Sequence, residues 1–236
     1  MSELEKQSTQ SFLDGNWPQT VDRARQWAKE DSENPIPHAL LNIAYTELQA
    51  NDASKAELDL AYGSSDQVTK VEEWASALSL SNRDNPRAYL LRGAAFEVGG
   101  DNQTAIDSYG RAIAVDPTFK QGYESLGNLY LANHRLDDAL ATYLNLLERN
   151  PNYSAAYDHI ATVHVMKGDI SGAVVYFEKA VALDPNDVTS QYNLASAYLD
   201  SGAPEKAVSV LQKVVQLDPS GEAGQDAREK LVELSK

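Results

Sequence analysis

The feature that most constrains this chain is a period of 34 residues. Proline recurs at this interval, and four further series of residues keep the same register. The five series are Pro117, Pro151, Pro185 and Pro219; Phe96, Tyr130, His164 and Tyr198; Ala105, Ala139, Ala173 and Ala207; Gly93, Gly127, Ala161 and Ala195; and Gly100, His134, Gly168 and Gly202. Such self-similarity is typical of repeat architectures, in which each unit buries its hydrophobic face only against its neighbours. The sequence therefore predicts a stacked array of equal units.

The residue types within each block predict two antiparallel helices. Positions are numbered from the first residue of each 34-residue block, and the blocks begin at residues 86, 120, 154 and 188. At 100° per residue, positions 4, 7, 8 and 11 fall within about 100° of one another and form one stripe to be buried. Gly or Ala at position 8 and Ala at position 20 allow the two helices to approach closely, and the aromatic residues at positions 4, 11 and 24 fill the space around them. The residue at position 15 makes the turn, and proline at position 32 ends the second helix. On this basis Tyr130 is a core residue, and its truncation to alanine is expected to cost about 3–5 kcal/mol.

The pattern resembles the tetratricopeptide repeat (TPR), most clearly in SerLeuGlyAsnLeuTyr at residues 125–130. The resemblance implies an all-α fold, an α-solenoid of antiparallel helix pairs wound into a right-handed superhelix. The regular repeats are expected at residues 86–119, 120–153, 154–187 and 188–221, followed by a capping helix in residues 222–236. Residues 1–34 are interpreted as a divergent N-terminal capping repeat.

Residues 35–85 are interpreted as an irregular repeat, because Pro35 and Pro86 are 51 residues apart, which is 34 plus 17. Residues 73–80 have the composition of an ordinary second helix. The insertion of about 17 residues is therefore expected near residues 50–66. It is either an additional short helix or an extension of the first helix.

Composition and motifs exclude several functions. A net charge of −15 opposes binding to nucleic acids and to anionic lipids. There is no cysteine and no apolar run of about 18 residues, so neither thiol chemistry nor direct membrane insertion is expected. No motif of a nucleotide, zinc or calcium site is present, so we expect no cofactor, no metal and no enzymatic activity. The N-terminus lacks the pattern of a signal peptide, which favours the cytoplasm, or a periplasmic or extracytoplasmic location if a signal sequence was removed.

The resemblance implies that the inner faces of the first helices line a groove for a partner. These faces carry positions 2, 5, 9, 12 and 13, opposite the buried stripe. The candidate residues are Leu90, Glu97, Val98, Glu124, Asn128, Leu131, Asp158, Thr162, Val165, Met166, Tyr192, Ser196, Leu199 and Asp200. A surface that mixes apolar side chains and carboxylates predicts a protein or peptide partner with an apolar segment flanked by Lys or Arg. The expected role is that of a scaffold or adaptor in a multiprotein complex, and the alternative is a solenoid that associates with itself into a homo-oligomer.

Overall fold

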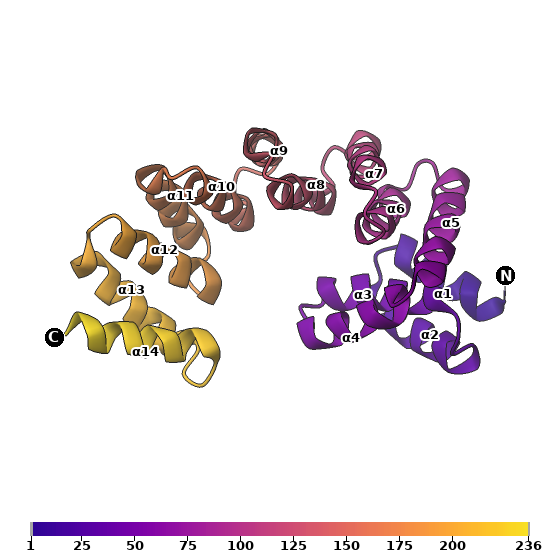
Figure 1. Cartoon of the computed structure of the whole chain (residues 1–236), viewed down its shortest axis with the longest axis horizontal. Coiled ribbons are helices and arrows are strands. Elements are labelled where there is room, and N and C mark those ends of the chain that lie inside the picture. Colours follow the sequence, from indigo (N-terminus) through magenta and orange to yellow (C-terminus); the bar gives the residue numbers. More distant parts are fainter. Residues whose placement is uncertain (1, 236) are drawn as a thin grey trace. The chain divides into compact units, whose positions relative to one another are not determined.

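The structure is a computed structural model that describes residues 2–235, and over this range it contains fourteen α-helices and no strand (Figure 1). The helices are α1 (Glu3–Leu13), α2 (Trp17–Glu30), α3 (Pro35–Glu47), α4 (Asn51–Tyr62), α5 (Ser65–Ser81), α6 (Pro86–Val98), α7 (Asn102–Val115), α8 (Lys120–Ala132), α9 (Leu136–Arg149), α10 (Ser154–Met166), α11 (Ile170–Leu183), α12 (Val188–Asp200), α13 (Pro204–Leu217) and α14 (Glu222–Leu234). The chain forms two compact units, Met1–Leu129 and Tyr130–Lys236, and the boundary falls within α8.

The repeated small and aromatic positions form the core of each helix pair. At positions 20, 24 and 27 every residue of the four regular repeats is buried, which follows from their place on the inward side of the second helix. Gly93 shows why position 8 must be small, because a Cβ there would collide with the ring of Tyr109. That ring is buried, and its hydroxyl donates a hydrogen bond of 2.6 Å to Glu97.

The turn within each helix pair repeats the same backbone geometry. The residue at position 15 has a positive φ in all six pairs, and the next N–H donates to a carbonyl five residues upstream, for example from Asp101 to Phe96 and from Asp169 to His164. This is the Schellman ending, which satisfies carbonyls at the end of the first helix. The six residues at this position are Gly15, Gln49, Gly100, His134, Gly168 and Gly202.

Position 4 ties each of the last three regular repeats to the one before it. The hydroxyls of Tyr123 and Tyr157 donate to the carbonyls of Pro117 and Pro151, over 3.2 and 3.0 Å. Gln191 has no ring, but its amide donates to the Pro185 carbonyl over 2.9 Å. A proline carbonyl at a helix end has no helical partner, so this bond satisfies it and fixes the next helix.

The irregular repeat differs from its sequence-based interpretation. Residues 51–62 form a separate helix, α4, and α3 packs against it as closely as α6 packs against α7. The hairpin turn at Gln49 keeps the 34-residue spacing from Gly15. The second helix of this repeat is thus α4, and the additional element is α5, which has 17 residues and packs against α3, α4 and α6. Residues 51–62 are thus a separate short helix, one of the two forms expected for the insertion, and its pairing with α3 leaves α5 as the helix added to the repeat pattern.

The α3–α4 hairpin was hard to recognise because hydrogen bonds replace the usual contact between small residues. The Asn42 amide donates to the carbonyl and hydroxyl oxygens of Ser54, over 2.9 and 3.0 Å. The Ser54 hydroxyl is also within 3.1 Å of the Asn42 carbonyl. Asn42 and Ser54 stand at positions 8 and 20, where the regular repeats have Gly or Ala.

Position 11 is less buried than the sequence predicts in three of the four regular repeats, at Phe96, Tyr130 and His164. Tyr130 is half-buried, and the Arg135 guanidinium lies 4.4 Å from its ring centroid. Arg92 covers Phe96 and Lys206 covers Tyr198 in the same way. The ring therefore forms the outer edge of the core beneath a cation, and truncation of Tyr130 should cost less than the 3–5 kcal/mol typical of a fully buried aromatic residue.

Candidate binding surface

The C-terminal unit carries a shallow groove between α10 and α12. It has a volume of about 180 Å³ and is lined by Thr162, Val165, Phe177, Asn193, Ser196, Ala197 and Asp200. Thr162 and Val165 come from α10, and Asn193, Ser196, Ala197 and Asp200 come from α12. Phe177 is a buried core residue of α11 that reaches the floor. The groove thus has an apolar floor and a polar rim.

Asp158 stands beside this groove on α10. Both of its carboxylate oxygens lie within 3.5 Å of the Asn193 amide nitrogen on α12. Burial raises the pKa of Asp158, and hydrogen bonds from Ser190 and Asn193 oppose that rise. The carboxylate links the first helices of two successive repeats, and this internal role makes it less available to a partner than Asp200, which is exposed.

Several of the predicted residues in the C-terminal unit are accessible. Val165 and Met166, at the end of α10, have exposed fractions of 38% and 42%. Leu131 and Leu199 are half-buried. Tyr192 is also half-buried, and its hydroxyl lies 3.4 Å from an Asp226 carboxylate oxygen on α14. Four of the predicted residues, Thr162, Val165, Ser196 and Asp200, line the groove together.

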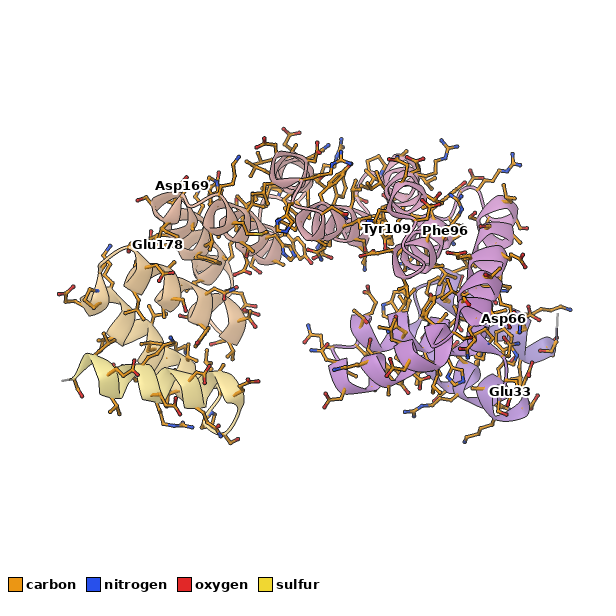
Figure 2. The ribbon with its side chains drawn as sticks, viewed as in Figure 1. Glu33, Asp66, Phe96, Tyr109, Asp169 and Glu178 are labelled. Carbon is orange, nitrogen blue, oxygen red and sulfur yellow. The ribbon has the colours of Figure 1, made fainter. Side chains whose placement is uncertain are left out.

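The predicted face of the N-terminal unit is largely covered. Leu90 is only 5% exposed, so the prediction that it lies on an accessible surface was wrong. Its helix, α6, packs against α1 and α5 as well as α7, and the sequence pattern of a regular repeat does not include those extra neighbours. Glu97 is half-buried and accepts a hydrogen bond from the hydroxyl of Tyr109, which Figure 2 labels, and burial raises the pKa of the Glu97 carboxyl.

The remaining predicted residues of this unit differ in exposure. Val98 is 43% exposed at the end of α6. On α8, Asn128 is exposed and Glu124 is half-buried. The accessible apolar part of the predicted face therefore lies mainly in the C-terminal unit.

Three lining residues of the groove were not predicted. Asn193 stands at position 6, which at 100° per residue lies within about 20° of position 13, so the helical pattern could have included it. Ala197 and Phe177 belong to the core positions. No surface pattern would identify them, because only the edge of a buried side chain reaches the groove.

The histidines of the C-terminal unit make structural contacts. His159 stacks on Tyr143 with centroids 4.8 Å apart, and burial lowers its pKa. His164 stacks on Tyr176 and lies 2.8 Å from an Asp169 carboxylate oxygen. Within residues 2–235, no group of three or more His, Cys, Asp or Glu residues could hold a metal ion. Over the same range no helix combines the length and the apolar character that crossing a membrane requires.

Comparison with known sequences supports the repeat assignment. Two profiles described as tetratricopeptide repeat match residues 125–187 and 164–231. The Small glutamine-rich tetratricopeptide repeat-containing protein 2 of Mycosarcoma maydis is 32% identical over 89 residues, which are 38% of this chain. The match spans 25% of the length of that relative.

Solved structures share the fold at low sequence identity. TTC0263, a thermophilic TPR protein in Thermus thermophilus, has a TM-score of 0.60 and 20% identity, with 86% of this chain and 97% of that chain covered. MamA has a TM-score of 0.57 and 19% identity, with 65% of this chain and 90% of the MamA chain covered. YrrB, a TPR protein with an unusual peptide-binding site, has a TM-score of 0.51 and 19% identity, with 87% of this chain and 97% of the YrrB chain covered. The two profiles thus identify tetratricopeptide repeats in residues 125–231, and the solved structures, with the repeated helix pairs described above, show that the chain has an α-solenoid fold.

Proposed function

We propose that this protein is a scaffold or adaptor that binds a peptide or helix of another protein on the inner face of its C-terminal repeats. TPR proteins in general bind peptides or proteins and are not enzymes, and YrrB is a TPR protein with a peptide-binding site. The observation that carries the proposal is the groove between α10 and α12, with Val165 and Met166 exposed beside it. Accessible apolar side chains that meet at a concave surface are typical of an interaction site.

The polar groups at this groove favour a particular partner. Asp200 is exposed at one end, Asp158 stands near the other, and the lining contains no basic residue among those described. An apolar segment would occupy the floor formed by Phe177 and Ala197. Lys or Arg residues on either side of that segment would meet the carboxylates. Thr162, Asn193 and Ser196 offer hydrogen-bond groups to the partner backbone.

A peptide selection tests this proposal directly. We expect selection of random displayed peptides against the full chain to enrich apolar segments flanked by Lys or Arg. The double variant Val165→Glu and Met166→Glu should bind the selected peptides at least about tenfold more weakly, because it places two charges where apolar contacts form.

Val175→Glu is the matched control. Val175 is 49% exposed on α11, carries the same kind of side chain and does not line the groove. This variant should retain binding. Enrichment of acidic peptides, or equal loss of binding in both variants, would refute the assignment. Light scattering over a concentration range tests the alternative, because growth in mass with concentration would indicate self-association.

A further inference from the structure

A second concave surface lies in the N-terminal unit, and the additional helix α5 creates it. It has a volume of about 470 Å³ and lies between the α2–α3 turn and α5. The turn and the start of α3 contribute Asp31, Glu33, Asn34, Pro35 and Ile36, and α5 contributes Lys70, Glu73 and Trp74. The 34-residue repeat pattern has no helix at the place of α5, so this wall of the pocket comes from outside the regular pattern.

The chemistry of the pocket is that of a cation site. Trp74 is half-buried and packs on the core with one part while lining the pocket with another. Three carboxylates, those of Asp31, Glu33 and Glu73, line the same space. An indole face attracts a cation through its quadrupole, and carboxylates at the rim add charge-assisted hydrogen bonds.

The one lysine of the pocket does not cancel this charge. Lys70 makes an ion pair of 2.7 Å with Asp66 one turn earlier on α5, and Asp66 is outside the lining. The negative charge of Glu33 also attracts the Lys70 ammonium; Figure 2 labels Glu33 and Asp66. The pair Lys70–Asp66 is neutral, so the remaining three carboxylates leave the pocket negative.

Elsewhere the chain itself shows how an aromatic side chain of this kind is used. The Arg87 guanidinium lies 5.7 Å from the Trp17 ring and 5.5 Å from the Phe119 ring, and Arg135 lies 4.4 Å from the Tyr130 ring. Among residues 2–235 we find no guanidinium placed over Trp74. The pocket therefore has the aromatic and acidic parts of such a contact and lacks the arginine.

We propose that this pocket binds an arginine side chain on an extended segment of another protein. Arginine fits better than lysine because its planar guanidinium stacks on the indole while its N–H groups reach two carboxylates at once. The site is separate from the groove of the C-terminal unit and does not depend on the function proposed for that groove. It would give the protein a second contact with a basic partner.

The test uses a probe that cannot occupy the apolar groove. Acetyl-GlyArgGlyArgGly-amide has no apolar side chain, and versions with Lys or Glu in place of Arg are matched probes. Each is titrated into the full ¹⁵N-labelled chain at about 150 mM salt, where surface attraction is screened. The indole N–H signal of Trp74 is assigned with Trp74→Phe. We expect this signal to shift with the Arg probe, less with the Lys probe, and not with the Glu probe.

Charge-neutral variants identify the carboxylates. The double variant Glu33→Gln and Glu73→Gln should lower the affinity of the chain for the Arg probe by at least about tenfold. The control Glu205→Gln and Glu222→Gln removes the same charge from exposed positions of α13 and α14 and should change the affinity less than about twofold. Val165→Glu with Met166→Glu should leave binding intact, which separates this site from the groove. An unchanged Trp74 signal, or equal weakening in both charge variants, would overturn the proposal.

Discussion

At the scale of single residues, the turn at position 15 shows what the backbone demands of the sequence. All six residues there have φ between 56° and 86°, a region that L-residues other than glycine enter at a cost. Four of them are glycine, whereas Gln49 and His134 are not. These two turns therefore carry local strain that the Schellman hydrogen bonds and the packing of the helix pair must offset.

Replacing either residue with glycine should stabilise the protein. The left-handed conformation costs a typical L-residue about 1–2 kcal/mol, and the greater freedom of glycine in the unfolded chain removes about 0.4–1 kcal/mol of that gain. We expect Gln49→Gly and His134→Gly each to raise the free energy of unfolding by about 0.5–1 kcal/mol in urea titrations. Gly168→Ala should lower it. Loss of stability in both glycine variants would show that their side chains contribute more than the backbone costs.

Glu97 should make stability depend on pH. Burial raises its pKa, although the hydrogen bond from Tyr109 lowers it in part. A raised folded-state pKa stabilises the fold below the unfolded-state pKa, and this contribution is lost as the pH rises through the folded-state value. The free energy of unfolding of the wild type should therefore rise relative to that of Glu97→Gln as the pH falls from about 7 to about 4.

The hydroxyl of Tyr109 provides the control for this prediction. Tyr109→Phe removes the bond that lowers the Glu97 pKa. In a chain that carries Tyr109→Phe, the rise in unfolding free energy of the Glu97 form relative to the Glu97→Gln form should begin at a higher pH. Parallel pH profiles for the wild type and Glu97→Gln would contradict the assignment. Urea titrations at a series of pH values provide the measurement.

At the scale of the element, prediction succeeded where one side chain decides the packing. The residues at positions 8, 20 and 24 reflect contact between two helices of one hairpin, and the regular helices end where the turn residue and proline require. Prediction failed where two different solutions fit one position. Asn42 and Ser54 bring α3 and α4 together through hydrogen bonds, and no repeat pattern of small residues reports that contact.

The candidate groove follows the same rule. Thr162, Val165, Ser196 and Asp200 could be predicted because the helical period alone places them opposite the buried stripe. Leu90 stands at an equivalent position but is buried, because α6 packs against α1 and α5. The pocket at Trp74 could not be predicted at all, since it depends on where the irregular helix α5 lies.

Close approach of α6 and α7 should make Gly93 sensitive to a single methyl group. A Cβ at Gly93 would collide with the Tyr109 ring, which is buried and tied to Glu97. Overpacking of this kind costs about 1–3 kcal/mol. Alanine also forms helices better than glycine by about 1 kcal/mol, so the net loss for Gly93→Ala should be about 0–2 kcal/mol in thermal or urea unfolding.

Gly110 on α7 is the matched control for Gly93. A Cβ there would meet no atom within 4 Å, so Gly110→Ala should gain stability through helix propensity alone. The two substitutions add the same methyl group to adjacent helices of one hairpin. Equal effects in both would show that the contact between Gly93 and Tyr109 does not limit the helix spacing.

At the scale of the whole molecule, the two units differ in how their parts are connected. In the N-terminal unit, contacts join residues far apart in the sequence. The Leu13 carbonyl accepts from the Asn85 amide over 3.0 Å, and Gln121 donates to Glu47, 74 residues away. In the C-terminal unit the helices pack against their near neighbours in sequence, as α12 does against α13 and α14. Local contacts favour local opening, whereas distant contacts couple the elements that they join.

Native-state hydrogen exchange should reveal this difference. Leu211→Ala and Phe12→Ala each truncate a fully buried side chain, and each should cost about 2–5 kcal/mol. In the C-terminal unit we expect Leu211→Ala to speed amide exchange in α12, α13 and α14 while exchange in α3 and α6 is unchanged. Phe12→Ala should speed exchange in α1, α2, α3 and α6 together, because α1 packs against the other three helices and the Leu13 carbonyl accepts from Asn85 at the start of α6. If Leu211→Ala speeds exchange equally along the chain, the repeats unfold as one cooperative body and the distinction between the units does not extend to their stability.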